Sequence, residues 1–178
     1  MSVSGIRELS LITTPPIDRL PIKTAIMKYD STTIKQSVLK ELYRNGQVYI
    51  ITPRVEGIYE IAEKITQLVP QARIKVAHGQ MNKTVLEDTM DDFSNGKFDV
   101  LIATTIIESG IDIPNANTMN VFDAHKFGLA QLYQIRGRIG RSKLTSFAYF
   151  LIPSHSQITP GAQLRLKILK KLDNIGAG

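Results

Sequence analysis

Short apolar runs alternate with stretches of helical spacing along most of this chain. The run FDVLIAT at 98–104 is apolar at its centre, which is typical of a strand covered on both faces of a sheet. Such alternation predicts an α/β fold, with helices on both faces of a mostly parallel central sheet. The expected strands are 24–29, 47–51, 73–78, 98–104, 118–123 and 146–152. The expected helices are 31–44, 55–69, 82–94, 128–141 and a last one from residue 160.

Composition limits the functional classes. The chain has 178 residues, enough for one sizeable domain with its own core. Its net charge of +6 is compatible with a polyanionic partner such as nucleic acid. It has no cysteine, which excludes disulfides and cysteine-ligated metal sites, and we expect no metal site at all. Without a run of about 18 apolar residues or a signal-peptide pattern, we expect a cytoplasmic protein with no membrane partner.

The segment QIRGRIGR at 134–141 is unusual, because the expected helix there contains two glycines. Gln134, Arg138 and Arg141 fall at i, i+4 and i+7 and would share one stripe of the helix. Gly137 and Gly140 would let another surface approach closely. Arginine suits phosphate, since its planar guanidinium stays charged and donates two parallel hydrogen bonds. A surface helix with scattered arginines would explain neither glycine. Leu132, Ile135 and Ile139 would pack on the sheet from the opposite side.

A second polar segment follows the strand at 98–104. Thr104 and Thr105 end the strand, and Ser109, Gly110 and Asp112 come shortly after. Hydroxyls and backbone N–H groups directly after a strand can bind phosphate, whereas a carboxylate suits a ribose hydroxyl or a cation. The alternative is that the segment only connects two strands.

These segments resemble the motifs of superfamily 2 helicases. Residues 134–141 resemble motif VI, 100–112 motif V, AHGQM at 77–81 the intervening HG motif, and QVYIITPRVE at 47–56 motif IV. The stretches SGIRELSLITTPPIDRLPI, TTIIESGIDIPNANT and FGLAQLYQIRGRIGRS narrow the resemblance to the transcription-repair coupling factor (Mfd) family. The related RecG family shares the last two stretches. Pro53 and Gly57 depart from the Asn and the acidic residue expected there, which leaves the role of Arg54 open.

The resemblance implies a domain organisation. Residues 1–23 would be the tail of a first helicase domain, with motif III at 4–10, and a linker. Residues 24–154 would form the C-terminal RecA-like domain, a three-layer α/β/α unit. Residues 155–178 would begin a helical extension like the TRG motif, which couples ATP hydrolysis to translocation in RecG and Mfd. The alternative for its basic residues, Arg165, Lys167, Lys170 and Lys171, is a solvated face.

The resemblance also implies roles for individual residues. Arg138 and Arg141 would face the γ-phosphate of ATP, one of them as the arginine finger, with Gln134 fixing their orientation. Gly110, Asp112 and Gly137 would lie beside the nucleotide. The expected contacts to the DNA backbone are Thr52, Gly79, Thr104 and Thr105. His78 is expected to be a hydrogen-bonded structural residue rather than a ligand.

The sequence contains neither a Walker A pattern GxxxxGK[ST] nor a DExH motif. ATP with Mg²⁺ would therefore be bound mainly by a first RecA-like domain outside this chain, and we expect this chain alone to be inactive. The function implied is the second motor domain of an ATP-hydrolysing double-stranded DNA translocase in transcription-coupled repair. The whole protein would have RNA polymerase and excision-repair proteins as partners. The alternatives are a RecG-like fork-remodelling helicase, or a non-catalytic module that binds DNA or protein. An RNA helicase is disfavoured, because those usually carry Asp where this chain has Thr105.

Overall fold

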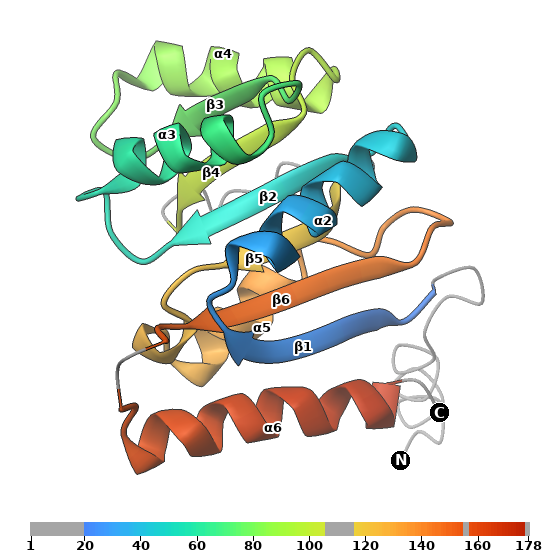
Figure 1. Cartoon of the computed structure of the whole chain (residues 1–178), viewed down its shortest axis with the longest axis vertical. Coiled ribbons are helices and arrows are strands. Elements are labelled where there is room, and N and C mark those ends of the chain that lie inside the picture. The colour runs from blue at the N-terminus through green and yellow to red at the C-terminus, as the bar shows by residue number, and fades with distance from the viewer. Residues whose placement is uncertain (1–19, 106–115, 155–156, 177–178) are drawn as a thin grey trace, which may run out of the picture.

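The computed structural model describes residues 20–105, 116–154 and 157–176, and within them six parallel strands form one sheet (Figure 1). The spatial order is β1-β6-β5-β2-β4-β3, and every neighbouring pair is parallel. The strands are β1 (Ile22–Lys28), β2 (Gln47–Thr52), β3 (Ile74–Ala77), β4 (Val100–Thr104), β5 (Ala116–Val121) and β6 (Ser146–Ile152). The helices are α2 (Ser31–Tyr43), α3 (Ile58–Leu68), α4 (Lys83–Ser94), η1 (Ala124–Lys126), α5 (Leu129–Arg136) and α6 (Pro160–Gly176). The predicted α/β fold with a parallel sheet is confirmed.

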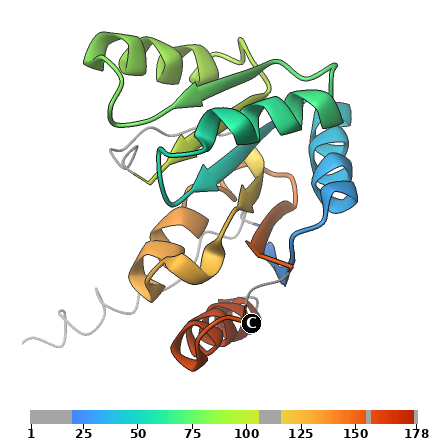
Figure 2. The ribbon, with the colours of Figure 1, turned by 60° about the vertical axis from the view of Figure 1, so that its left-hand side comes forward.

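Two hydrophobic clusters lie on the two faces of the sheet. On one face α2 and α3 contribute Ile34 and Ile65, which pack with Ile50 and Ile102 of the central strands. On the other face α4, α5 and α6 pack on the sheet (Figures 1 and 2). Alternate residues of each central strand enter opposite clusters, because successive side chains of a strand point to opposite faces. Both faces are covered, so β4 is buried and apolar at its centre, as the run at 98–104 predicted, whereas β5 also buries the polar side chains of Asn117, Thr118 and Asn120.

The first helix illustrates how closely local signals define element ends. α2 begins after Asp30, whose carboxylate accepts hydrogen bonds from the backbone N–H groups of Thr32 and Thr33 at 3.3 and 3.2 Å. It ends before Asn45, which has a positive φ of 57°. The bounds agree with the predicted helix at 31–44 to within one residue.

The predicted helix at 128–141 is wrong at its C-terminal end. α5 stops at Arg136, Gly137 caps it, and Gly140 has a φ of +84°. A Cβ on Gly140 would lie 2.9 Å from Ile22 Cγ1 of the edge strand, so this position needs glycine for both backbone and space. Arg138 and Arg141 therefore lie in a turn after the helix and share no helical stripe with Gln134. The turn explains Gly140, whereas Gly137 has a helical φ of −66° and is not required by the backbone.

The residues expected to pack behind the arginines do so. Leu132, Ile135 and Ile139 are all buried in the cluster on the α5 face, although Ile139 lies beyond the helix. The three apolar residues were thus correctly predicted to be buried. Their helical spacing, however, wrongly predicted that the helix would continue to residue 141.

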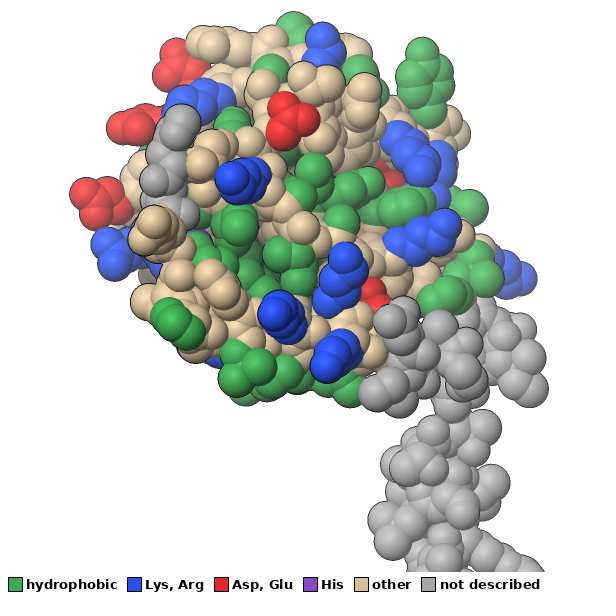
Figure 3. Space-filling view, turned by 60° about the horizontal axis from the view of Figure 1, so that its bottom comes forward, with side chains coloured by type: hydrophobic (Ala, Val, Ile, Leu, Met, Phe, Trp, Pro, Cys, Tyr) green, Lys and Arg blue, Asp and Glu red, His purple; other side chains and the backbone are tan. Residues whose placement is uncertain are grey.

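The last helix, α6, packs on the same core as α5. Its Leu166 and Leu169 are buried, whereas Lys167 and Lys170 are exposed beside an apolar groove between α6 and β1 (Figure 3). Arg165 is not merely solvated, because its guanidinium donates to the carbonyl oxygens of His125 and Phe127, at 3.1 and 3.2 Å. The segment 1–19, with the predicted motif III, lies outside the described residues. The assignment of 155–178 to a TRG-like extension stays a prediction.

No helix within the described ranges is both long and apolar enough to cross a membrane.

Candidate functional site

Four residues of the QIRGRIGR segment surround one pocket of about 330 Å³, which we call the arginine pocket: Gln134, Gly137, Arg138 and Arg141. Arg141 and Gln134 are exposed, and Arg138 is half-buried. The turn is closed by hydrogen bonds from Arg138 N to Ile135 O at 3.1 Å and from Gly137 N to Tyr133 O at 2.9 Å. The structure therefore brings the predicted residues together, through a tight turn instead of a continuous helix.

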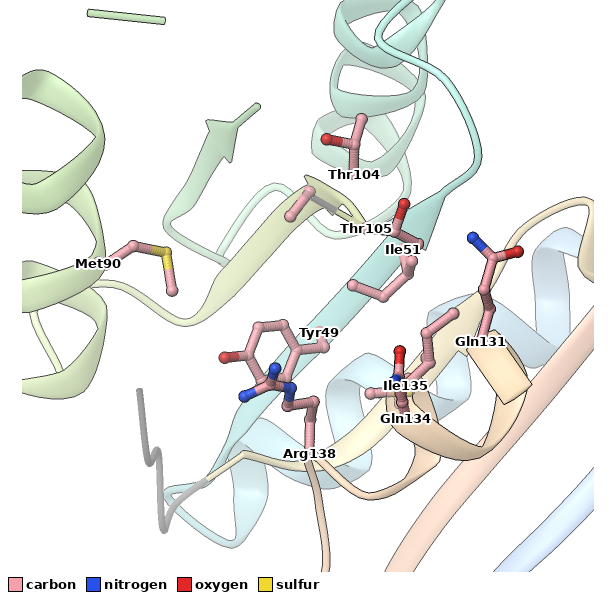
Figure 4. Close-up of a pocket in the computed structure, with 11 residues that line it drawn as sticks. Tyr49, Ile51, Met90, Thr104, Thr105, Gln131, Gln134, Ile135 and Arg138 are labelled. Carbon is pink, nitrogen blue, oxygen red and sulfur yellow. The ribbon is translucent and has the colours of Figure 1, made fainter. Parts of the chain in front are cut away.

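A second hollow connects this segment to the end of β4. It is a cavity of about 40 Å³, and Figure 4 shows Gln134 and Arg138 on its α5 side and Thr104 and Thr105 beyond β2. Tyr49 and Ile51 of β2 contribute apolar walls between them. The Thr104 hydroxyl is buried and has no hydrogen-bond partner among the described residues. An unpaired buried hydroxyl is costly, so this group is a candidate for a ligand contact.

The predicted DNA-contacting residues lie at the carboxyl edge of the sheet. Thr52 pairs with Thr104 in register, and β3 ends at Ala77 beside Ala103 of β4, so Gly79 follows at the same edge. Gly79 is exposed and Thr105 is half-buried. The Thr52 hydroxyl donates to the carbonyl oxygen of Arg54 at 2.9 Å, which gives this side chain a local structural contact.

His78 is hydrogen-bonded on both ring nitrogens, as expected of a structural histidine. Its Nε2 lies 3.0 Å from the Tyr59 hydroxyl, and its Nδ1 accepts from the backbone N–H of Gln80 at 3.3 Å. The side chain is buried, and its backbone N–H contacts the Met81 sulfur at 3.3 Å.

A buried polar cluster is linked to the turn that carries Arg138 and Arg141. We call this cluster the Glu41 network; it comprises Glu41, Arg44, Asn117 and Thr118. The fully buried Glu41 carboxylate accepts from Arg44 Nη2 at 2.5 Å, from Thr118 Oγ1 at 2.6 Å and from Asn117 Nδ2 at 3.3 Å. Ser142, the residue after Arg141, donates to Asn117 Oδ1 at 2.6 Å. The turn that carries Arg141 is therefore anchored to a buried carboxylate.

The interpretation of the sequence missed this network. One signal was present: Glu41 falls at i+7 from Ile34 and i+3 from Val38, on the face of α2 that the apolar pattern assigns to the core. A carboxylate at such a position is buried only with partners. One partner, Arg44, follows three residues later, but Asn117 and Thr118 come from β5, some 76 residues on, and no local pattern indicates them.

The third arginine of the segment, Arg136, faces inward. It forms an ion pair with Asp173 of α6 and donates to the Leu169 carbonyl oxygen at 3.3 Å. Asp173 also accepts from the backbone N–H of Thr24 on the edge strand at 2.9 Å. Arg136 therefore joins α5, α6 and β1 and does not line the arginine pocket.

Gly110 and Asp112, predicted beside the nucleotide, lie outside the described residues. Among the side chains that the structure describes, no group of three or more His, Cys, Asp or Glu residues could hold a metal ion.

The single parallel sheet covered by helices on both faces has the RecA-like fold, which is the fold of helicase motor domains. The chain belongs to the family described as the helicase conserved C-terminal domain, whose model matches residues 33–143.

Two relatives specify the resemblance within that family. The transcription-repair-coupling factor of Myxococcus xanthus is 51% identical over all 178 residues of this chain, which correspond to 15% of that protein. The factor of Staphylococcus haemolyticus is 48% identical over the same length, again 15% of that protein. The chain therefore spans about 15% of the length of the curated relatives it matches, and the resemblance to this family seen in the sequence is confirmed.

Among solved structures, RecG bound to a three-way DNA junction is similar with a TM-score of 0.75 at 28% identity, over 90% of this chain and 23% of that chain. Both predicted families thus recur, and the identities of 48% and 51% to the transcription-repair-coupling factors exceed the 28% identity to RecG.

Proposed function

We propose that this chain is the second motor domain of an ATP-dependent double-stranded DNA translocase that acts in transcription-coupled repair. One observation carries the proposal: Gln134, Arg138 and Arg141 line a common pocket, and the pocket borders the hollow at Thr104 and Thr105. Residues suited to phosphate and residues suited to a DNA backbone are thereby neighbours, as a motor that couples the two requires.

The chemistry of the arginine pocket fits a nucleoside triphosphate held by a second domain. The lining residues that the structure describes include two arginines and an amide but no carboxylate. Guanidinium groups stabilise the charge that develops on a transferred phosphoryl group, by roughly 10³ to 10⁵ in rate for an arginine finger. Without a carboxylate here, Mg²⁺ would be held by the acidic motif of a first RecA-like domain. By resemblance, Gly110 and Asp112 would contact the sugar and phosphates, and Gly137 would allow close approach.

The DNA contacts proposed at the carboxyl edge are Thr52, Gly79, Thr104 and Thr105. Such hydroxyl and backbone contacts to phosphate carry no base sequence, which suits movement along any duplex. The unpaired Thr104 hydroxyl is the strongest of them, since that of Thr52 already donates to Arg54 O. Movement would follow when ATP closes the cleft between the two domains and hydrolysis reopens it.

For the whole protein we propose RNA polymerase and excision-repair proteins as partners, together with the first RecA-like domain in cis. A RecG-like fork-remodelling role is the alternative that the structural likeness at 28% identity supports. The identities of 48% and 51% to transcription-repair-coupling factors favour the first role. Displacement of a stalled RNA polymerase by the full-length protein, compared with regression of a model fork, separates the two.

The test uses the full-length protein with Arg138→Ala and Arg141→Ala. Each substitution should lower the DNA-stimulated kcat for ATP by at least about 100-fold with an unchanged circular dichroism spectrum, and the larger loss identifies the finger. Lys35→Ala is the matched control, because Lys35 is exposed on α2, on the opposite face of the sheet.

Full ATPase activity in both arginine variants would exclude this function and favour a non-catalytic module. The isolated 178-residue chain should hydrolyse ATP no faster than background.

A further inference from the structure

Tyr59 is an exposed aromatic residue at the carboxyl edge of the sheet, in the first turn of α3. Its side chain is 61% exposed, and its ring meets that of His78 edge-on at a centroid distance of 5.8 Å. The hydroxyl lies 3.0 Å from His78 Nε2. A large exposed aromatic held in place by a buried histidine is pre-organised, since the pairing restricts its rotamers.

The hydrogen bonds around His78 determine which atom donates. The backbone N–H of Gln80 donates to Nδ1 at 3.3 Å, so Nδ1 carries a lone pair. In a neutral imidazole the proton is then on Nε2, and Nε2–H donates to the Tyr59 oxygen. This tautomer follows from the hydrogen-bond network.

The phenolic proton is consequently available for another acceptor. A tyrosine oxygen that accepts from His78 directs its own O–H away from the imidazole. Within the described part of the chain, the Tyr59 hydroxyl makes no other hydrogen bond. A fixed, solvent-facing donor is thus presented beside Gly79, the exposed residue that follows His78.

The position of this donor suggests the acceptor. α3 starts shortly after β2 ends, and Tyr59 reaches His78 at the end of β3, so the hydroxyl lies at the edge that also holds Thr52 and Thr104 (Figure 1). Two carboxylates of the same segment, Glu56 and Glu60, are exposed. They repel any anionic partner, so a backbone phosphate here would be held mainly by the neighbouring hydroxyl and backbone groups of the same edge, and Tyr59 would add one neutral donor.

We propose that Tyr59 is an additional phosphate-binding residue, whose hydroxyl, oriented by His78, donates to a non-bridging phosphate oxygen of the DNA backbone. The inference rests on the proposed DNA interface and adds to it a residue outside the helicase motifs recognised in the sequence. Because the donor is neutral, the contact should add affinity without adding salt dependence, unlike a lysine or arginine contact.

The test measures binding of a fluorescent duplex to the full-length protein with a non-hydrolysable ATP analogue, at several salt concentrations. Tyr59→Phe removes only the hydroxyl and should weaken binding about three- to tenfold, with the slope of log Kd against log salt unchanged. Tyr43→Phe is the matched control: Tyr43 is 89% exposed at the end of α2, at the opposite edge of the sheet, and should bind like the wild type.

The same measurement on Thr104→Ala separates the role proposed for Tyr59 from the DNA interface on which that role rests. If Thr104→Ala weakens binding and Tyr59→Phe does not, the role of Tyr59 is overturned and the proposed interface stands. If Tyr59→Phe weakens binding and Thr104→Ala does not, Tyr59 contacts DNA but the assignment of Thr104 is wrong. If neither variant differs from the wild type, both proposals fail. A reduced salt slope for Tyr59→Phe would contradict a neutral contact.

Discussion

The Glu41 network and the arginine pocket both contain arginine, but they use it in opposite ways. In the network, Arg44 donates to the buried Glu41 carboxylate and, through Nη1, to the Thr145 carbonyl oxygen at 2.9 Å. In the pocket, Arg138 and Arg141 line a hollow whose described lining has no carboxylate. Arg44 satisfies a buried carboxylate that would be costly to leave unpaired, whereas the guanidinium groups of Arg138 and Arg141 line a hollow that an anion could enter.

The two regions are also joined. Ser142 bonds to Asn117 of the network and directly follows Arg141 of the pocket. The Glu41 network thereby supports the arginine pocket, because a turn held by buried hydrogen bonds keeps its side chains in one orientation. Substitutions in one region at a time test whether the Glu41 network serves stability and the arginine pocket serves function.

The largest effect on stability is expected from Glu41→Ala. It leaves Arg44 and Thr118 without their buried acceptor, which should lower the free energy of unfolding by about 3–5 kcal/mol. Urea denaturation followed by circular dichroism measures it.

Glu87→Ala provides the control for the loss of a carboxylate, since Glu87 pairs with Lys83 on an exposed helix face and should change stability little. A loss of less than about 1 kcal/mol for Glu41→Ala would contradict a structural role for the network.

The next largest effect is expected at Gly140, and it should differ from that at Gly137. Gly140→Ala places a Cβ at positive φ and 2.9 Å from Ile22, and should destabilise the domain by roughly 1–3 kcal/mol. Gly137→Ala should be nearly neutral, because Gly137 has a helical φ of −66° and its Cβ would meet atoms at ordinary distances.

Thermal unfolding of both variants checks the contrast, and equal midpoints would refute it. A stable Gly137→Ala variant with reduced DNA-stimulated ATPase in the full-length protein would further support nucleotide approach at this position.

The smallest effect should come from the ion pair of the exposed Arg73 with the half-buried Asp99, 3.0 Å apart. Burial alone would raise the pKa of Asp99, but the hydrogen bonds and charge of Arg73 outweigh it and hold the pKa below the ordinary 3.8. A carboxyl group with a lowered folded pKa stabilises the fold above its unfolded pKa, and this contribution is lost as the pH falls through the folded value.

Asp99→Asn should therefore lower Tm by no more than about 2 °C at pH 6, and the difference should start to shrink near about pH 4 and close as the pH falls through the lower folded pKa. Differential scanning calorimetry at the two pH values measures this. A difference that grows on acidification would show that the sign is wrong.

Much of the fold was predictable, because its determinants are local. The apolar runs predicted all six strands, and Asp30 and Asn45 marked the ends of α2. The spatial order of the strands was not predictable, since parallel pairing joins segments far apart, such as Ile22 with Ser146. The helix at 128–141 failed for a related reason: the spacing of Gln134, Arg138 and Arg141 fits a helical period, but the chain turns at Gly140, which has a positive φ and lies where a side chain would clash with Ile22.

The candidate site, too, was predictable where its determinants are local and unpredictable where they are not. By itself the sequence determined which runs form the sheet, and four helicase-like motifs in order led to the prediction, still untested, that Gln134, Arg138 and Arg141 face phosphate. Only the tertiary structure decided that Arg136 turns inward to Asp173 while Arg138 lines the pocket, and that Tyr59 pairs with His78. The physical reason is that periodicity and capping act over a few residues, whereas the partner of a polar side chain is chosen by elements that meet only when the sheet has assembled.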